Sequence, residues 1–218
     1  MRETIILFDL DGTILNTLPD LRNAANHALE VLGFPSRTDE EIRRFLGNGV
    51  GFLMKRALPE GCPEDIWEKA VELQKTYYLS HLMVETRPYK EVPEMMEQLR
   101  KEGYRLGTVS NKFDAAVQKL ISAFFPGVFD VALGERKNVP KKPDPAMVQA
   151  ALREMHAQED CRLIYVGDSE VDLRTAENAR AVPILVDWGF RDREELQHLG
   201  DHRIVSSAGE LMDLIRII

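Results

Sequence analysis

The sequence contains few cysteines, no long apolar run and no excess of basic residues, and each shortage excludes a class of protein. The two cysteines, Cys62 and Cys161, form no CxxC pair, so neither a disulfide framework nor a zinc site is expected. No apolar stretch approaches the roughly 18 residues that a membrane span needs, and Asp9 makes the N-terminal apolar segment too short for a signal peptide. Acidic residues outnumber basic ones by 36 to 28, which disfavours a general nucleic-acid binder. We therefore expect a cytoplasmic protein whose partners include neither a membrane nor a nucleic acid.

The apolar residues predict an α/β fold. Short apolar runs alternate with helical patterns, which is typical of a parallel sheet with helices on both faces. We therefore predict a doubly wound, Rossmann-like parallel sheet. The strand candidates are Thr4–Phe8, Tyr104–Val109, Phe129–Leu133, Leu163–Val166 and Val182–Val186, with a weaker one near Arg203–Val205.

The segment between the first two predicted strands is too long for a simple crossover. It holds several helical patterns, including one that starts near Thr17 and one that follows the capping-box sequence from Thr38 to Glu41. We therefore expect an α/β core formed by residues 1–15 and 85–218, and a smaller all-helical cap domain formed by residues 16–84. Later in the chain, Asp144 is the predicted N-cap of a helix that has Pro145 as its first residue.

Two carboxylates follow the first predicted strand directly. Asp9 and Asp11 stand two residues apart, and Gly12 permits a turn that other residues resist. In an open α/β sheet, ligands bind just beyond the carboxyl ends of the strands. The pair is therefore a candidate binding site, although an Asp-Gly turn with two solvated acids explains the same residues.

Polar side chains also follow two later strands. Ser110 and Asn111 end the second strand, and Asp168 lies at the end of the Leu163–Val166 strand, with Asp172 one helical turn beyond it. Lys142 stands between these two segments, next to a proline. Each feature has a plain structural reading: a helix N-cap, acids that favour a helix start, or a solvated basic loop.

The combination of these features indicates phosphoryl chemistry. Acids gathered near one point repel one another unless a cation compensates them, and ligands that offer only oxygen favour Mg²⁺ over Zn²⁺. A lysine and a hydroxyl beside such an ion are the donors that a phosphate dianion requires. The sequence therefore predicts metal-assisted phosphoryl transfer.

In their order along the chain, four segments resemble the four motifs of the haloacid dehalogenase superfamily; they contain Asp9, Ser110, Lys142 and Asp168. The helical cap inserted after the first motif is also similar to that superfamily. Within the superfamily, the Gly47-Asn48-Gly49 segment, the Lys142-Pro143 pair and the Trp188-Gly189-Phe190-Arg191 segment resemble those of phosphoglycolate phosphatases. The resemblance implies a hydrolase that acts on a small phosphorylated metabolite through an aspartyl-phosphate intermediate.

The resemblance also implies roles for the acids. Asp9 would be the nucleophile, and Asp11 would protonate the leaving alkoxide and later deprotonate the hydrolytic water, a role that starts from a protonated Asp11. Mg²⁺ would be bound by the Asp9 and Asp168 carboxylates and by the backbone carbonyl of Asp11. Asp172 would orient bound water or Asp168.

The remaining implied residues bind the substrate. Ser110 and Lys142 would hold the transferring phosphoryl oxygens. Gly47, Asn48 and Gly49 would approach the substrate from the cap, although a plain turn between helices explains them equally well. Further phosphate contacts are expected from Gly12, Thr13 and Asn111.

Several alternatives remain open from the sequence alone. A pyrophosphatase, a sugar-phosphate phosphatase or a mutase of the same superfamily would share these motifs. A phospho-acceptor signalling domain or an inactive binding protein is the alternative outside enzymes. The Asp11 carboxylate favours ester hydrolysis over dehalogenation, because a departing halide needs no proton. The oligomeric state cannot be predicted from the sequence.

Overall fold

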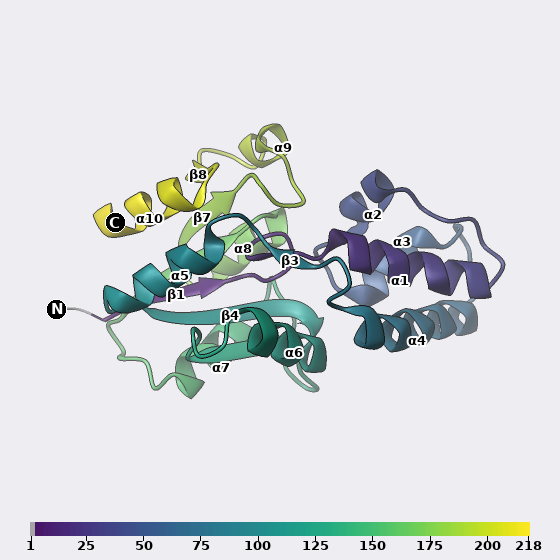
Figure 1. Ribbon diagram of the computed structural model, residues 1–218, viewed down its shortest axis with the longest axis horizontal. Coiled ribbons are helices and arrows are strands. Elements are labelled where there is room, and N and C mark those ends of the chain that lie inside the picture. The colour runs from purple at the N-terminus through teal and green to yellow at the C-terminus, as the bar shows by residue number, and fades with distance from the viewer. Residues whose placement is uncertain (1–2) are drawn as a thin grey trace. The chain divides into compact units, whose positions relative to one another are not determined.

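The computed structural model describes residues 3–218, which form two compact units (Figure 1). The sheet unit comprises the chain up to Leu15 together with Pro88–Ile218. The helical unit comprises Asn16–Arg87, and so ends slightly beyond residue 84, where the sequence pattern placed its end. A two-stranded sheet of β2 (Leu15–Asn16) and β3 (Arg87–Pro88) is formed where the chain passes between the units.

The sheet unit contains a six-stranded parallel sheet in the order β5-β4-β1-β6-β7-β8. The chain starts in the middle of the sheet at β1, adds β4 and β5 on one side, and then adds β6, β7 and β8 on the other. The predicted doubly wound parallel sheet is confirmed, and the winding direction changes around β1. The strands are β1 (Thr4–Phe8), β4 (Arg105–Phe113), β5 (Val131–Glu135), β6 (Arg162–Gly167), β7 (Val182–Val186) and β8 (Ile204–Val205).

Helices cover both faces of this sheet (Figure 1). Successive residues of β1 point to opposite faces, yet Ile5, Ile6, Leu7 and Phe8 are all fully buried, as a strand between two helical layers requires. One face packs against the apolar sides of α7 and α8. The helices of this unit are α5 (Val92–Lys101), α6 (Asp114–Phe124), α7 (Ala146–Glu154), α8 (Glu170–Asn178), α9 (Arg193–Gln197) and α10 (Ala208–Ile217).

Two strands differ from their predicted ranges by more than one residue at an end. β4 continues to Phe113, so Ser110 and Asn111 lie inside the end of the strand rather than after it, where the pairing with β5 becomes irregular. β5 begins at Val131, because the ring of Phe129 packs against aromatic neighbours instead of continuing the ladder.

One predicted helix cap is wrong by one residue. Pro145, rather than Asp144, is the N-cap of α7, because its carbonyl accepts the first helical hydrogen bond, from the Gln149 N–H at 2.9 Å. Asp144 stabilises the same helix start from one residue earlier: its Oδ1 accepts a hydrogen bond from the backbone N–H of Ala146 at 2.8 Å.

The helical unit consists of four packed helices. The predicted capping box is confirmed, because the Thr38 hydroxyl accepts from the Glu41 N–H and the Glu41 carboxylate accepts from the Thr38 N–H. The buried carboxylate of Asp20 accepts hydrogen bonds from the backbone N–H groups of Glu85 and Thr86, which fastens the end of the unit to its first helix. The helices are α1 (Leu18–Val31), α2 (Asp39–Phe45), α3 (Val50–Ala57) and α4 (Glu64–His81).

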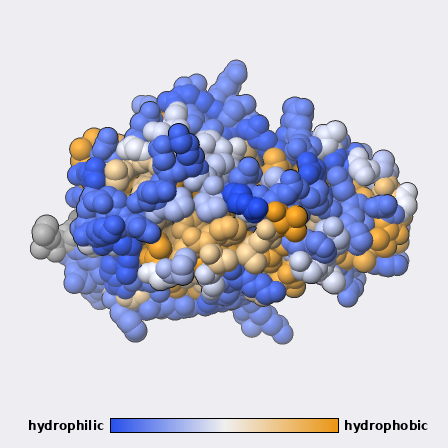
Figure 2. Space-filling view, viewed as in Figure 1, coloured by the Kyte–Doolittle hydropathy of each residue, from blue (hydrophilic) through white to orange (hydrophobic). Residues whose placement is uncertain are grey.

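On the face shown in Figure 2, hydrophilic residues cover most of the area and apolar residues form separate patches. Within residues 3–218, no helix is both long enough and apolar enough to cross a membrane.

Candidate functional site

The candidate residues from three motifs converge at the carboxyl ends of β1, β4 and β6. Asp9 follows β1 directly, and its backbone N–H donates to the carbonyl of Val166 in β6 at 2.9 Å. Asp168 follows β6, which is paired in register with β1. The parallel pairing of these strands thus places two carboxylates that are far apart in the sequence at one edge of the sheet.

Three of the predicted acids form a buried cluster. Asp9, Asp168 and Asp172 each offer a carboxylate oxygen, and these oxygens lie within 4.8 Å of one another. Burial raises the pKa of Asp9 to about 7, with Lys142 opposing the rise and Asp172 adding to it. Burial, followed by the charges of Asp172 and Asp9, also raises the pKa of Asp168 well above its usual value. Such a cluster stores repulsion that a bound cation would relieve.

The donor atoms of this cluster fit a hard divalent cation. All of them are carboxylate oxygens, which are the ligands that such cations prefer. Asp9 Oδ1 is buried and accepts no well-formed hydrogen bond from any residue in the described part of the chain, although the Lys142 ammonium lies 2.8 Å away. An oxygen in this state retains a lone pair for a metal ion.

Lys142 lies between two of the acids. Its Nζ is 2.8 Å from Asp9 Oδ1 and 2.8 Å from Asp172 Oδ1, and its side chain is 1% exposed. Burial alone would lower the pKa of Lys142, but the charges of Asp172 and Asp9 outweigh burial and raise it well above its usual value. The ammonium also lies 5.6 Å from the centre of the Tyr165 ring, within cation–π range. Lys142 is therefore held charged inside the site.

Asn111 holds the backbone of Lys142 in place. Its side-chain oxygen accepts from the Lys142 N–H at 2.9 Å, and its side-chain nitrogen donates to the Lys142 carbonyl at 3.0 Å. The sequence analysis expected Asn111 to contact phosphate. That role remains a prediction, and the two hydrogen bonds show that the amide also fixes the loop that carries the lysine.

Asp172 organises the turn that carries Asp168. Its Oδ2 accepts from the Ser169 hydroxyl at 2.6 Å and from the backbone N–H groups of Ser169 and Asp168. Gly167 leaves the room for this carboxylate, because a Cβ at that position would lie 2.2 Å from the Asp172 Cβ. The predicted supporting role of Asp172 behind Asp168 remains a prediction.

Asp168 is oriented by two further segments. The backbone N–H of Phe190 donates to its Oδ2 at 2.6 Å, and the Thr13 hydroxyl donates to its Oδ1 at 3.2 Å. Gly12 has φ +87°, and a Cβ there would lie 2.3 Å from the same carboxylate, so only glycine lets the backbone approach this closely. The indole of Trp188 donates to the Thr13 carbonyl at 3.0 Å and ties the loop after β7 to the site.

Asp11 occupies a different environment from the other three acids. Its two carboxylate oxygens lie 2.8 and 3.0 Å from Nζ of Lys112, whose side chain is 3% exposed. The sequence analysis gave Lys112 no role. The available signal was a lysine directly after Ser110 and Asn111 in a segment otherwise made of buried residues. Ser110 is itself buried, and its hydroxyl accepts from the Lys112 backbone N–H at 3.3 Å.

The predicted cap residues belong to the helical unit. Gly47, Asn48 and Gly49 connect α2 to α3, and Gly49 is the N-cap of α3 with φ +82°. Their contact with substrate remains a prediction.

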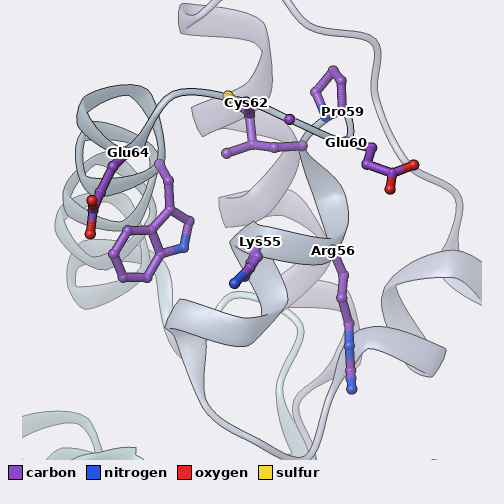
Figure 3. A pocket seen from close by; sticks show the side chains of 9 residues that line it. Lys55, Arg56, Pro59, Glu60, Cys62 and Glu64 are labelled. Atoms are coloured by element: carbon purple, nitrogen blue, oxygen red, sulfur yellow. The ribbon is translucent and has the colours of Figure 1, made fainter.

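A hollow of about 690 Å³ also lies in the helical unit (Figure 3). It contains none of the predicted site residues. The indole N–H of Trp67, which lines it, donates to the backbone carbonyl of Gly51 at 2.9 Å and so serves the packing of α3 against α4. The hollow is lined by Lys55, Arg56, Leu58, Pro59, Glu60, Gly61, Cys62, Glu64 and Trp67.

Comparison with known proteins finds a matching family, similar sequences and similar structures. Residues 6–186 match the haloacid dehalogenase-like hydrolase family. A phosphoglycolate phosphatase from Cereibacter sphaeroides is 34% identical over 215 residues, which cover 97% of each chain. A solved structure from Lactobacillus delbrueckii subsp. bulgaricus is 35% identical, with a TM-score of 0.91 and 99% of each chain covered. CbbY from Rhodobacter sphaeroides, solved in complex with phosphate, is 27% identical, with a TM-score of 0.74 and coverage of 97% of this chain and 96% of CbbY.

Proposed function

Since this chain belongs to the haloacid dehalogenase-like hydrolase family, we propose that it is a Mg²⁺-dependent phosphatase of a small phosphorylated metabolite. Phosphoglycolate is the substrate we favour, because curated relatives that are 34% identical and align over 97% of this chain are phosphoglycolate phosphatases.

One observation carries the proposal. The charged ammonium of Lys142 forms ion pairs with both Asp9 and Asp172. The third buried acid of the cluster, Asp168, lies at the same carboxyl edge of the sheet. A phosphate dianion needs cationic donors, and an attacking carboxylate needs its own charge screened from that dianion. Lys142 is placed to serve both needs.

The first half of the proposed reaction transfers the phosphoryl group to Asp9. A carboxylate oxygen of Asp9 attacks phosphorus, and the bond between phosphorus and the leaving oxygen breaks. That oxygen takes a proton from Asp11 and departs as an alcohol. Ser110 and Lys142 hold the transferring phosphoryl oxygens.

The second half regenerates the carboxylate. Water gives a proton to Asp11 and attacks phosphorus, the bond between phosphorus and the Asp9 oxygen breaks, and inorganic phosphate leaves. Asp11 then carries the proton that it donates in the next cycle.

Mg²⁺ would be held by the carboxylates of Asp9 and Asp168 and by the backbone carbonyl of Asp11. When bound, it supplies the positive charge that lets a carboxylate approach a phosphate dianion. Asp172 and Thr13 would keep the Asp168 carboxylate in the orientation that binds the ion.

The helical unit would act as a cap that selects the leaving group. The Gly47-Asn48-Gly49 segment supports this assignment, because glycines allow a backbone to approach a ligand closely. The core chemistry would then be common to many phosphate esters, and the cap would decide which alcohol departs.

The test is phosphate release from phosphoglycolate and from p-nitrophenyl phosphate, with Mg²⁺ and with a chelator. We expect release that needs the cation, and loss of turnover in Asp9→Asn. Asp201→Asn, which changes an exposed aspartate of the same unit, serves as the matched control and should keep full activity. Full turnover in Asp9→Asn would remove Asp9 from the mechanism. A panel of sugar phosphates and pyrophosphate decides whether phosphoglycolate is the preferred substrate.

A further inference from the structure

Lys112 is a buried cation that lies beside the proposed acid–base residue. Its ammonium engages both oxygens of Asp11, at 2.8 and 3.0 Å, and its side chain is 3% exposed whereas that of Asp11 is 19% exposed. A lysine is rarely buried unless it is paired, so this contact accounts for the burial of Lys112.

The backbone of Lys112 is held in the sheet. Lys112 lies at the end of β4, which pairs with β1 and with β5. Its N–H also donates to the Ser110 hydroxyl. Because both carboxylate oxygens of Asp11 contact this one ammonium, the contact sets the orientation of that carboxylate.

The contact separates Asp11 from the other acids. Asp11 stands two residues from Asp9, yet the buried acidic cluster consists of Asp9, Asp168 and Asp172. A free carboxylate at position 11 could turn toward a divalent cation bound by that cluster, since such cations readily add carboxylate ligands. The pull of the Lys112 ammonium opposes that rotation.

We propose that Lys112 is a positioning residue that reserves the Asp11 carboxylate for proton transfer and keeps it from becoming a metal ligand. This inference rests on the proposed phosphatase function. In the reaction, Asp11 gives one proton to the leaving oxygen and takes one from water, while Lys112 keeps its own protons throughout.

The kinetic test is a double-mutant cycle. Asp11→Asn should lower kcat by about 10²- to 10⁴-fold, the usual contribution of general acid–base catalysis. Lys112→Met should lower kcat by about tenfold or more at unchanged KM, since it acts through Asp11, and Lys112→Arg should restore part of the loss. The double variant should be no slower than Asp11→Asn alone. Lys137→Met, an exposed lysine of the same unit, is the matched control and should turn over as the wild type does.

Other roles for Lys112 give different results. If Lys112 bound the substrate directly, Lys112→Met would raise KM. If it only supported the fold, its effect would multiply with that of Asp11→Asn and Lys112→Arg would not rescue it. Either result would overturn the proposal.

A second readout does not depend on turnover. Titration calorimetry with Mg²⁺ should show binding about tenfold tighter in Lys112→Met than in the wild type, because the released Asp11 carboxylate joins the ligands. The same substitution made in Asp11→Asn should leave the affinity nearly unchanged. An equal gain in both backgrounds would mean that Lys112 acts only as a nearby charge, and would refute its positioning role. A wild type that binds Mg²⁺ but hydrolyses no phosphate ester would refute the proposed function, and this titration would still decide the role of Lys112.

Discussion

Replacing Lys142 by methionine tests how far the buried acids depend on one cation. The ammonium lies 2.8 Å from a carboxylate oxygen of Asp9 and from one of Asp172. At an effective dielectric constant near 20, each contact corresponds to a gross attraction of about 6 kcal/mol. Desolvation of the three ions cancels much of that attraction, so the gross figure does not measure stability.

The expected cost comes from what remains after the truncation. Lys142→Met leaves buried acids without their cation, and removal of one partner from a buried ion pair typically costs about 3–5 kcal/mol. Proteins of this kind are stable by roughly 5–15 kcal/mol in total. With a urea m value near 3 kcal/mol per molar, the midpoint of unfolding should fall by about 1–2 M.

The assay is urea unfolding followed by the fluorescence of Trp188, which lies in the sheet unit beside the site. A Trp67→Phe background removes the signal of the helical unit. Lys141→Met, an exposed neighbour paired with Glu135, is the matched control and should shift stability by less than about 1 kcal/mol. In the Lys142→Met background, Asp172→Asn should recover part of the loss, because it removes one uncompensated charge. An unchanged midpoint in Lys142→Met, or no recovery in the double variant, would show that Lys142 does not balance these acids.

Two further predictions concern the helical unit. The amide of Gln74 is buried and meets no hydrogen-bond partner within residues 3–218, so Gln74→Met should stabilise the protein by about 1–2 kcal/mol. The exposed control Gln197→Met should change the stability little. A loss of stability of Gln74→Met in urea unfolding would mean that the amide is satisfied. Asp20→Ala should destabilise the helical unit by about 2–4 kcal/mol, because it leaves the backbone N–H groups of Glu85 and Thr86 without their charged acceptor. Urea unfolding followed by Trp67 fluorescence measures this change, and an unchanged midpoint of unfolding would contradict the prediction.

The fold was predictable because its signals are local and repeated. The predicted strands Thr4–Phe8 and Val182–Val186 match the observed strands at both ends, because strands covered by helices on both faces are written as short apolar runs. The end of β4 was not predictable in this way. Ser110 and Asn111 are typical of turns, but in the folded protein they remain in the strand and are buried among site residues.

The positions of the site residues were easier to predict than their contacts. Sequence order and strand ends suffice to bring Asp9 and Asp168 to one edge of the sheet. The contact between Lys112 and Asp11 joins residues 101 positions apart, and it depends on the direction of a side chain at the irregular end of β4. Asn111 illustrates the same difficulty, because its amide closes two hydrogen bonds with a loop 31 residues away. Residue type indicates what a side chain can bind, whereas its partner is decided by tertiary geometry.

The charges of the site explain why both lysines are needed. The four acids at positions 9, 11, 168 and 172 carry four negative charges when ionised, and Lys112 and Lys142 return two positive ones. The six side chains then carry a net charge of −2, which one divalent cation would neutralise. The two lysines divide the acids by contact: Lys142 meets the cluster that would hold the metal, and Lys112 meets the acid proposed to move protons. A single lysine could not do both, because a cation that fixes Asp11 outside the cluster cannot also screen the carboxylates within it. In the proposed mechanism, the second lysine therefore lets four neighbouring carboxylates of identical chemistry take different tasks.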